Sequence, residues 1–359
     1  MTAAPIRVVQ WTTGIVGRSA LRAILDDSRL ELVGVFGHSA DKVGQDAGVI
    51  AGRDPVGVAI TDDIDALLAL GADCVVYMPH WPDIAQLERI LAAGTNVVTT
   101  ARLVNGEHYP GDAGERLRSA AIAGGATLVG TGMNPMFVPT LALAATAMCR
   151  NVRRISILES LDCAMYGSAG TWEAYGFGGP ADPAAVKSAL LRSEPDYPET
   201  LDSMARGIGV ELDAIELDVA LAVAVGDRDL GFMAIADGTV AALDARWRGL
   251  VDGHSVAELR MVWRLGSIFG HIDEPTWPIL HAYRLRIDGE PNVNLKLTFA
   301  PDDFETFDIG TTTAMPAVNA IPAIVAADPG VLGTVDLPIV TARHFDAQRL
   351  SAKREGSGQ

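Results

Sequence analysis

The first 130 residues alternate short apolar segments with helical patterns, and this alternation constrains the fold of the 359-residue chain more than any other feature. A strand–helix repeat of this kind fits a parallel sheet, because right-handed crossovers place helices on both faces and bury the strands. The sequence therefore predicts an α/β fold that begins with a Rossmann-type, doubly wound domain. We expect strands at residues 6–10, 30–36, 57–60, 74–78, 96–99 and 127–129, and helices at 15–25, 63–70, 83–93 and 111–123.

The turn after the first strand carries two informative glycines, Gly14 and Gly17. Against the dinucleotide-binding pattern G-x-G-x-x-G, Thr12 stands in place of the first glycine. Without a Cβ, Gly14 lets the backbone approach a pyrophosphate, and the helix that follows offers free N–H groups and its positive dipole end. A tight turn without a ligand is the alternative. The context favours cofactor binding by residues of this turn, namely Thr12, Thr13, Gly14, Ile15, Val16, Gly17 and Arg18.

The end of the second strand indicates which dinucleotide binds. NAD-preferring sites usually carry an acidic residue there, but residues 36–38 include no carboxylate. His38, Ser39 and Lys42, together with Arg18, could receive a 2′-phosphate, whereas Asp41 could favour either cofactor. The sequence predicts NADP as the preferred cofactor, with NAD possible.

The loops after the later strands are expected to reach the same edge of the sheet, where the nicotinamide end of the cofactor would lie. They contribute Met78, Pro79, Thr99, Thr100 and Ala101 as candidate cofactor contacts, and residues 130–135 after the sixth strand. The loop after the fifth strand continues to Glu107 and His108, which makes Glu107 a candidate functional acid.

Beyond residue 135 the alternation stops, and long strand-like segments predict a second α+β domain built on a large open mixed or antiparallel sheet. We expect a linking helix at 135–149, strands at 154–162, 210–224, 238–250 and 257–265, a hairpin of 282–287 with 292–299, and a helical insertion at 183–207. A helix at 312–326, interrupted by Pro322, should return to the first domain. The predicted domains are 1–134 with 312–350, a substrate and dimerisation domain at 135–311, and a flexible tail at 351–359. A homodimer through the open sheet is expected.

Aromatic and sulfur side chains gather near the end of the strand at 154–162, where they could form the wall of an apolar substrate pocket or belong to an ordinary core. The candidate pocket residues are Met133, Asn134, Met165, Tyr166, Trp172, Tyr175 and Phe177.

Composition excludes several classes of partner. The formal net charge of −17 argues against nucleic acid and against anionic membranes, whose phosphates require a basic surface. Three widely spaced cysteines and seven histidines without H-x-x-H spacing indicate neither a disulfide framework nor a metal site. No signal peptide or membrane span is recognisable, so a cytoplasmic location is expected.

Several motifs together resemble the dihydrodipicolinate reductase-like superfamily, and more narrowly its 2,4-diaminopentanoate dehydrogenase and native amine dehydrogenase branch. The matching segments are residues 9–18, His38-Ser39 with 42–44 and 46–48, the Gly-Thr-Gly-Met-Asn-Pro of 130–135, and the Val-Asn-Ala-Ile-Pro-Ala of 318–323, in which Asn319 is expected at the cofactor. The chain lacks the paired histidines and the Pro-Ser-Gly-Thr loop of dihydrodipicolinate reductase itself, which argues against a role in lysine biosynthesis.

The resemblance implies reversible, NAD(P)-dependent oxidative deamination of an amine or, in reverse, reductive amination of a ketone or aldehyde with ammonia. It also implies a pocket glutamate, for which Glu107 is the match, with Glu159 and Asp162 as open alternatives. Two other readings remain. One is an ammonia-independent carbonyl or imine reductase that uses Tyr166, Tyr175 or His108 as proton donor, and the other is a non-catalytic NADP-binding sensor.

Overall fold

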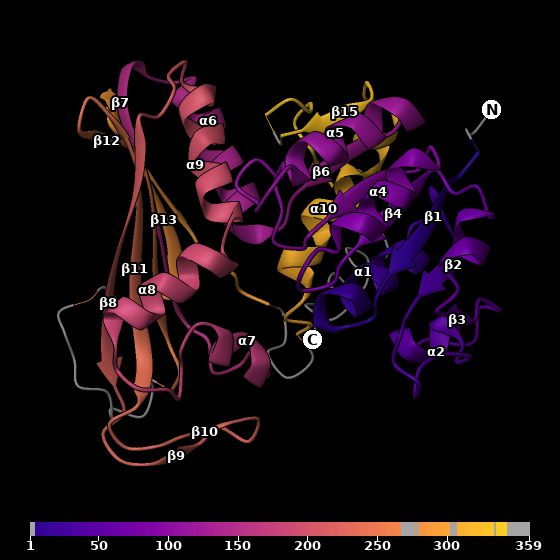
Figure 1. Cartoon of the computed structure of the whole chain (residues 1–359), viewed down its shortest axis with the longest axis horizontal. Helices are drawn as coiled ribbons and strands as arrows, with labels where there is room; N and C mark the ends of the chain where they lie inside the picture. The colour runs from indigo at the N-terminus through magenta and orange to yellow at the C-terminus, as the bar shows by residue number, and fades with distance from the viewer. Residues whose placement is uncertain (1–3, 267–276, 278–279, 302–306, 334, 343–359) are drawn as a thin grey trace, which may run out of the picture.

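The chain forms two lobes that lie side by side in a computed structural model, which describes residues 4–266, 277, 280–301, 307–333 and 335–342 (Figure 1). The N-terminal lobe is a seven-stranded parallel sheet of order β15-β6-β5-β4-β1-β2-β3 with helices on its faces. Its strands are β1 (Ile6–Trp11), β2 (Leu30–Phe36), β3 (Ile60–Thr61), β4 (Cys74–Tyr77), β5 (Asn96–Thr99), β6 (Thr127–Gly130) and β15 (Gly330–Leu332). Its helices are α1 (Ile15–Asp26), α2 (Ala47–Ala51), α3 (Ile64–Leu68), α4 (Ile84–Ala92), α5 (Ala113–Gly124) and α10 (Thr311–Val325). The predicted Rossmann-like sheet is confirmed.

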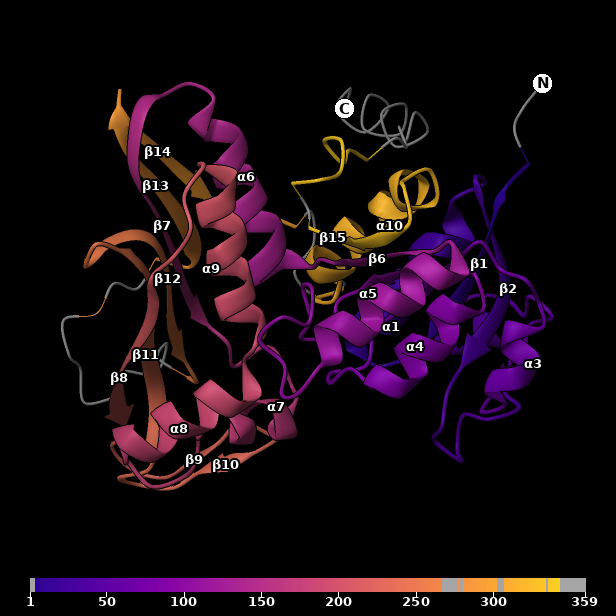
Figure 2. The same cartoon turned by 45° about the horizontal axis from the view of Figure 1, so that its top comes forward.

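The central strands are short and apolar because both of their faces are covered. All four residues of β4 are buried, and β1 pairs in parallel with β2 on one side and β4 on the other. Helices α4 and α5 cover one face, and α1 and α10 cover the other, where Val76 and Val98 pack against Ile321 (Figure 2). Burial on both faces explains why these strands read as continuous apolar segments.

Helix α10 runs from Thr311 to Val325 through Pro316 and Pro322, whereas the sequence predicts an interruption at Pro322. A proline inside a helix removes one hydrogen bond and costs about 3 kcal/mol. Here Ala317, Ile321 and Ile324 are buried against the N-terminal sheet, and this packing holds the helix together. The N-terminal end of α10 is fixed to α1 by Asp308, which accepts hydrogen bonds from Ser19 and Arg22 at 2.7 and 2.6 Å.

Two short elements near the second strand differ from the prediction. The strand expected at 57–60 is reduced to Ile60–Thr61, and an unpredicted five-residue helix, α2, precedes it. Both differences follow from Asp46, whose carboxylate caps α2 through Gly48 N and also accepts from the backbone N–H groups of Val56 and Gly57. Backbone groups that bind this carboxylate form a loop instead of a longer strand.

The second lobe is a six-stranded mixed sheet of order β14-β13-β7-β12-β11-β8, in which β7 and β12 run parallel and the other pairs of described strands run antiparallel. Its strands are β7 (Arg150–Asp162), β8 (Ala214–Val223), β11 (Val240–Val251), β12 (His254–Arg264), β13 (Ala282–Glu290) and β14 (Val293–Leu297), and β9 (Arg228–Asp229) with β10 (Ala234–Ile235) forms a small separate ribbon. Its helical elements are η1 (Met133–Phe137), α6 (Val138–Thr146), α7 (Ala169–Ala174), α8 (Pro183–Ser193) and α9 (Asp196–Gly207).

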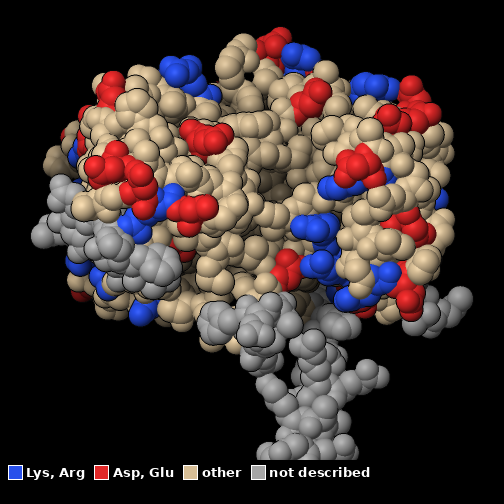
Figure 3. All heavy atoms as spheres, turned by 90° about the horizontal axis from the view of Figure 1, so that it is seen from below, with Lys and Arg blue, Asp and Glu red and all other residues tan. Residues whose placement is uncertain are grey.

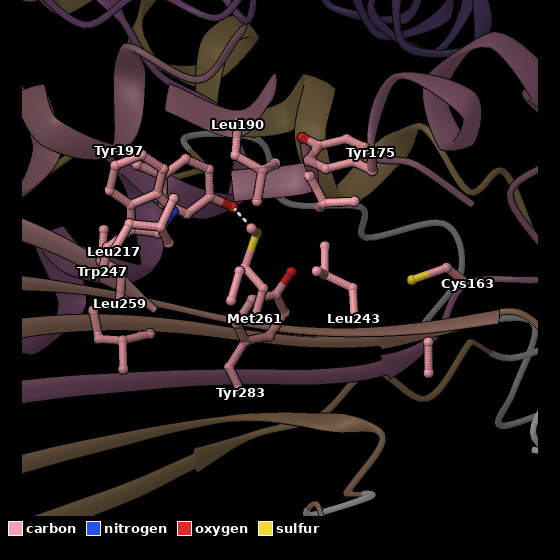
Figure 4. Packing of buried hydrophobic residues seen from close by; sticks show 14 of the residues in the cluster. Cys163, Tyr175, Leu190, Tyr197, Leu217, Leu243, Trp247, Leu259, Met261 and Tyr283 are labelled. Atoms are coloured by element: carbon pink, nitrogen blue, oxygen red, sulfur yellow. Dashed lines mark hydrogen bonds between the residues drawn. The ribbon is translucent and has the colours of Figure 1, made fainter. Parts of the chain in front are cut away.

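Helices α6, α8 and α9 lie on the face of this sheet that turns toward the N-terminal lobe (Figures 1 and 2). Figure 4 shows the layer between them, where Met261 and Tyr283 from the sheet face Tyr197 and Tyr175 from the helical side. Tyr197 donates to the sulfur of Met261 at 2.5 Å and stacks on Trp247 at 5.8 Å. This core brings the tyrosines of the helical layer close to the end of β7.

Within the described residues, no helix has both the length and the apolar character that crossing a membrane requires.

Candidate active site

A cavity of about 790 Å³ lies between the two lobes, at the carboxyl ends of the N-terminal strands. Figure 3 shows the hollow from below, with Lys and Arg side chains gathered on the N-terminal lobe beside it. Its walls come from α1, the loops after β4, β5 and β6, the end of β7, α7, α9 and the start of α10. The edge of a parallel sheet where strands end is the usual ligand site of such folds.

The glycine turn forms one end of this cavity, through Gly14, Ile15 and Val16. A Cβ built on Gly14 would meet no atom within 4 Å, so open space lies beside this backbone at the start of α1. Thr12, where the pattern has glycine, adopts a left-handed φ of +70°. The open cradle and the free N–H groups at the start of α1 fit a dinucleotide pyrophosphate.

Alanine at the two glycines should separate cofactor binding from folding. A Cβ on Gly17 would lie 2.4 Å from the carbonyl oxygen of Thr12, so Gly17→Ala should shift the turn and lower both the melting temperature and the NADPH affinity. Gly14→Ala fills only the cradle. It should therefore leave the melting temperature unchanged and weaken NADPH about tenfold. Thermal unfolding by circular dichroism and NADPH fluorescence titration check both variants. Equal loss of stability in both would contradict this division.

The residues expected around the 2′-phosphate lie beside the same turn. Lys42 donates from Nζ to the carbonyl oxygen of Thr13 at 3.2 Å, which places its ammonium between the turn and the end of β2. Ser39 is half-buried, and His38 and Arg18 are exposed. The structure thus brings Lys42 next to Thr13, while the other three surround the end of β2 and the start of α1.

The remaining predicted cofactor contacts divide into three groups. Met78, Pro79 and Thr100 line the cavity. Thr99 and Ala101 are fully buried behind it, where the Thr99 hydroxyl accepts from the Ala101 N–H at 2.9 Å. Asn319 lies elsewhere: it lines a second hollow between α10 and residues 336–341.

Among the described residues, the acidic side chains that line the cavity are Asp162, Asp196 and Glu159, of which Glu159 lies near the end of β7. The Glu159 carboxylate has two neighbours with hydrogen-bonding groups, Asn134 and Tyr283. Its Oε2 accepts from Asn134 Nδ2 at 2.6 Å, and its Oε1 accepts from the Tyr283 hydroxyl at 3.0 Å. Burial raises the pKa of Glu159, while these hydrogen bonds and the charge of Arg102 oppose the shift. Among the described residues, the buried Oδ1 of Asn134 has no hydrogen-bond partner. Two oxygen acceptors, one of them a carboxylate with a raised pKa, therefore meet at this wall.

The other two candidate acids are held differently. Glu107 does not line the cavity: its carboxylate is 40% exposed and pairs with Arg118 and Arg206 at 3.3 and 3.4 Å. The neighbouring His108 pairs with Asp202 at 2.5 Å, also away from the cavity. Asp162 lines the cavity, but its Oδ1 accepts from the N–H groups of Ala164 and Gly266, which gives it a role in the turn after β7. The sequence match for the pocket glutamate thus lies on the surface because its loop turns toward α9.

Most of the predicted substrate residues do converge. Met133, Asn134, Met165, Tyr166, Trp172 and Tyr175 line the cavity. Phe177 is instead buried behind Trp172, with ring centroids 5.8 Å apart, so it belongs to the core.

The structure adds residues to the cavity that the sequence did not single out. They include Asp196, Tyr197, Trp263, Tyr283, Thr312 and Thr313. The predicted hairpin contains Tyr283, but the sequence does not show that this residue lies opposite Glu159. That pairing depends on the register between β7 and β13. His80 and Trp81, on a loop that the sequence placed at the edge, also line it, and burial lowers the pKa of His80 to about 4, with a contribution from the charge of Arg102.

Arg102 is the one lysine or arginine among the described residues that line the cavity. Its guanidinium pairs with Glu194 and lies 3.5 Å from Asp196, and its carbon lies 5.4 Å from the Tyr175 ring centre. In the part of the chain that the structure describes, no group of three or more His, Cys, Asp or Glu side chains is arranged to hold a metal ion.

Comparisons with known proteins agree with this architecture. Residues 136–353 match the 2,4-diaminopentanoate dehydrogenase C-terminal domain, and residues 8–100 match the dihydrodipicolinate reductase N-terminus. The chain is 30% identical to an amine dehydrogenase of Streptomyces virginiae over 356 residues, which cover 93% of this chain and 96% of the relative.

Solved structures give the same picture. An amine dehydrogenase from Mycobacterium smegmatis superposes with a TM-score of 0.78 at 25% identity, covering 94% of this chain and 97% of that one. GenD2 from gentamicin A biosynthesis, solved in complex with NAD, shares the fold with a TM-score of 0.52 at 18% identity, covering 94% and 91% of the two chains. The chain therefore belongs to the 2,4-diaminopentanoate dehydrogenase family of oxidoreductases that act on amines.

Proposed function

We propose that this protein catalyses the reversible, NADP-dependent oxidative deamination of an amine, with Glu159 as the acid–base residue. The observation that carries the proposal is the pair formed by Glu159 and Asn134, buried at the wall of a cavity that also contains the glycine turn. In the direction of synthesis, a ketone or aldehyde, ammonia, a proton and NADPH would give an amine, water and NADP⁺. The bound cofactor supplies the hydride in this direction and accepts it in the other.

The oxygen acceptors of Glu159 and Asn134 at this wall suit a nitrogen nucleophile. Ammonia and an iminium ion carry N–H donors, which the Glu159 carboxylate and the unpartnered Asn134 Oδ1 can accept. A carboxylate beside a developing iminium also stabilises its positive charge. Glu159 and Asn134 would therefore orient ammonia and hold the cationic intermediate.

The same carboxyl group can move the protons that the reaction requires. Loss of water from a carbinolamine needs a proton donor, and deprotonation of ammonium needs an acceptor. Because burial raises the pKa of Glu159, it can exchange a proton at higher pH than an exposed glutamate. Tyr283, which donates to Glu159 Oε1, holds the carboxyl group in place for both steps.

The first test of this function is NADPH oxidation with small aliphatic and cyclic ketones, with and without ammonium at mildly alkaline pH. Turnover that requires ammonium is the expected result. Turnover without ammonium would instead favour a carbonyl or imine reductase, for which Tyr166 and Tyr175 line the cavity and His108 does not. Cofactor binding without turnover on either panel would favour a sensor.

NADP preference is expected to depend on Lys42. Its ammonium, held 3.2 Å from the Thr13 carbonyl oxygen, is placed to meet a 2′-phosphate near the turn. Lys42→Ala should weaken NADPH binding about tenfold and change NADH binding less than about twofold. Fluorescence titration with each cofactor measures both values. Lys187→Ala, at an exposed site on α8, is the matched control and should change neither.

We also propose a cytoplasmic homodimer that pairs through the sheet face turned away from α6, α8 and α9. That face carries charged side chains such as Arg260 with Asp244 and Arg154 with Asp288, which suit a polar contact between copies. Light scattering coupled to size-exclusion chromatography should give twice the chain mass. A monomer at micromolar concentration would overturn this assembly.

A further inference from the structure

The cavity contains a buried cation, Arg102, whose two terminal nitrogens already have partners in the protein. The Arg102 side chain is 12% exposed and reaches the cavity from the loop after β5. One of its terminal nitrogens pairs with Glu194, and the other donates to the Tyr175 hydroxyl. Tyr175 in turn donates to Glu194 Oε2 at 3.0 Å. Both terminal nitrogens thus contact groups from the second lobe, and the Trp81 ring of the N-terminal lobe lies 5.9 Å from the guanidinium carbon.

Two carboxylates occupy the positions that a ligand carboxylate would need. A free arginine binds a carboxylate through two parallel N–H groups. Here Glu194 and Asp196, with side chains only 2% and 3% exposed, lie at a terminal nitrogen and at Nε of the same guanidinium. Both belong to the corner between α8 and α9. The protein therefore supplies the counter-ions of Arg102 from its own chain.

We propose that Glu194 and Asp196 are specificity-determining residues, which hold Arg102 so that the site accepts amines and ketones without a carboxylate and rejects oxo acids and amino acids. This inference rests on the proposed function, whose substrate class it narrows. A substrate carboxylate would add a further negative charge to one cation and two anions, with Glu159 at the same cavity. In a buried site of low dielectric such repulsion is strong.

Matched substrates test the proposal directly: 5-oxohexanoate and its neutral isostere 5-oxohexanamide, each with NADPH and ammonium. The wild type should prefer the amide in kcat/KM by about a hundredfold. Asp196→Asn removes one resident charge and should reduce this preference at least about tenfold, as should Glu194→Gln. Asp202→Asn, on the same helix α9 but paired with His108 outside the cavity, should leave the preference unchanged.

A binding measurement separates this proposal from the proposed function. Hexanoate and hexanamide are titrated against the NADP-bound protein and followed by the melting temperature, which needs no turnover. We expect the wild type to bind hexanamide but not hexanoate, and Asp196→Asn and Glu194→Gln to bind hexanoate as well. This result supports the inference even if no ammonium-dependent activity is found. Three results would overturn the inference. The wild type could use or bind the acid and the amide equally, the folded variants could keep the wild-type preference for the amide over the acid, or neither ligand could bind. Far-ultraviolet circular dichroism establishes that the variants are folded.

Discussion

Glu159→Gln is expected to lower kcat for ammonium-dependent NADPH oxidation about a thousandfold, while NADPH affinity stays within about twofold of wild type. The substitution keeps the shape of the side chain but removes its ability to carry a charge or exchange a proton. Asn134 and Tyr283 retain a neighbour of the same size, so the fold should persist. Steady-state kinetics and NADPH fluorescence titration measure the two quantities.

Glu107→Gln is the matched control for this prediction. Its carboxylate pairs with Arg118 and Arg206 on the surface, and such exposed pairs contribute little to stability. Activity within about twofold of wild type is expected. Loss of turnover in this variant, with retention in Glu159→Gln, would show that the sequence match was right and that Glu159 has a structural role.

Removal of Glu199 should have the largest effect on stability. This carboxylate is fully buried on α9 and accepts from the backbone N–H groups of Val104 and Asn105 through Oε2 and of His108 through Oε1. It thereby fixes the loop after β5 to the second lobe. Glu199→Ala leaves three backbone donors unsatisfied and should lower the free energy of unfolding by at least about 3 kcal/mol. Urea unfolding followed by tryptophan fluorescence measures the loss.

The same residue should make stability depend on pH. Burial raises the pKa of Glu199 to about 7, although its three backbone donors oppose the shift. Because the folded pKa lies above that of the unfolded chain, this group stabilises the fold below about pH 4.5 and loses that contribution as pH rises through 7. Relative to Glu199→Gln, the wild type should lose up to about 3 kcal/mol over this range. Glu115→Gln, at an exposed position on α5, is the control and should show the same pH dependence of the free energy of unfolding as the wild type. The prediction is refuted if the difference in free energy of unfolding between wild type and Glu199→Gln does not change with pH.

The Rossmann-like lobe was predictable because its signals are local. Strands such as β2 and β5 appear in the sequence as short segments rich in leucine and valine, and their predicted bounds agree with the structure. The errors occur where a distant group competes for the backbone, as Asp46 does at residues 56 and 57. The six-stranded sheet was predicted as mixed or antiparallel, but the parallel pairing of β7 with β12 depends on strands far apart in the chain.

The glycine turn, the first lobe and the resemblance to amine dehydrogenases could be recognised from the sequence alone, because periodicity and short motifs are formed by residues close together in the chain. The sequence also supplied Glu159 as one of three possible acids. Only the tertiary structure placed Glu107 outside the cavity and Glu159 and Asp162 at its wall, because the course of the loop after β5 depends on Glu199, 95 positions from Val104. The ion pairs of Arg102 could likewise not be predicted from the sequence. Its partners Glu194 and Asp196 come from the other lobe, and only folding brings those charges together.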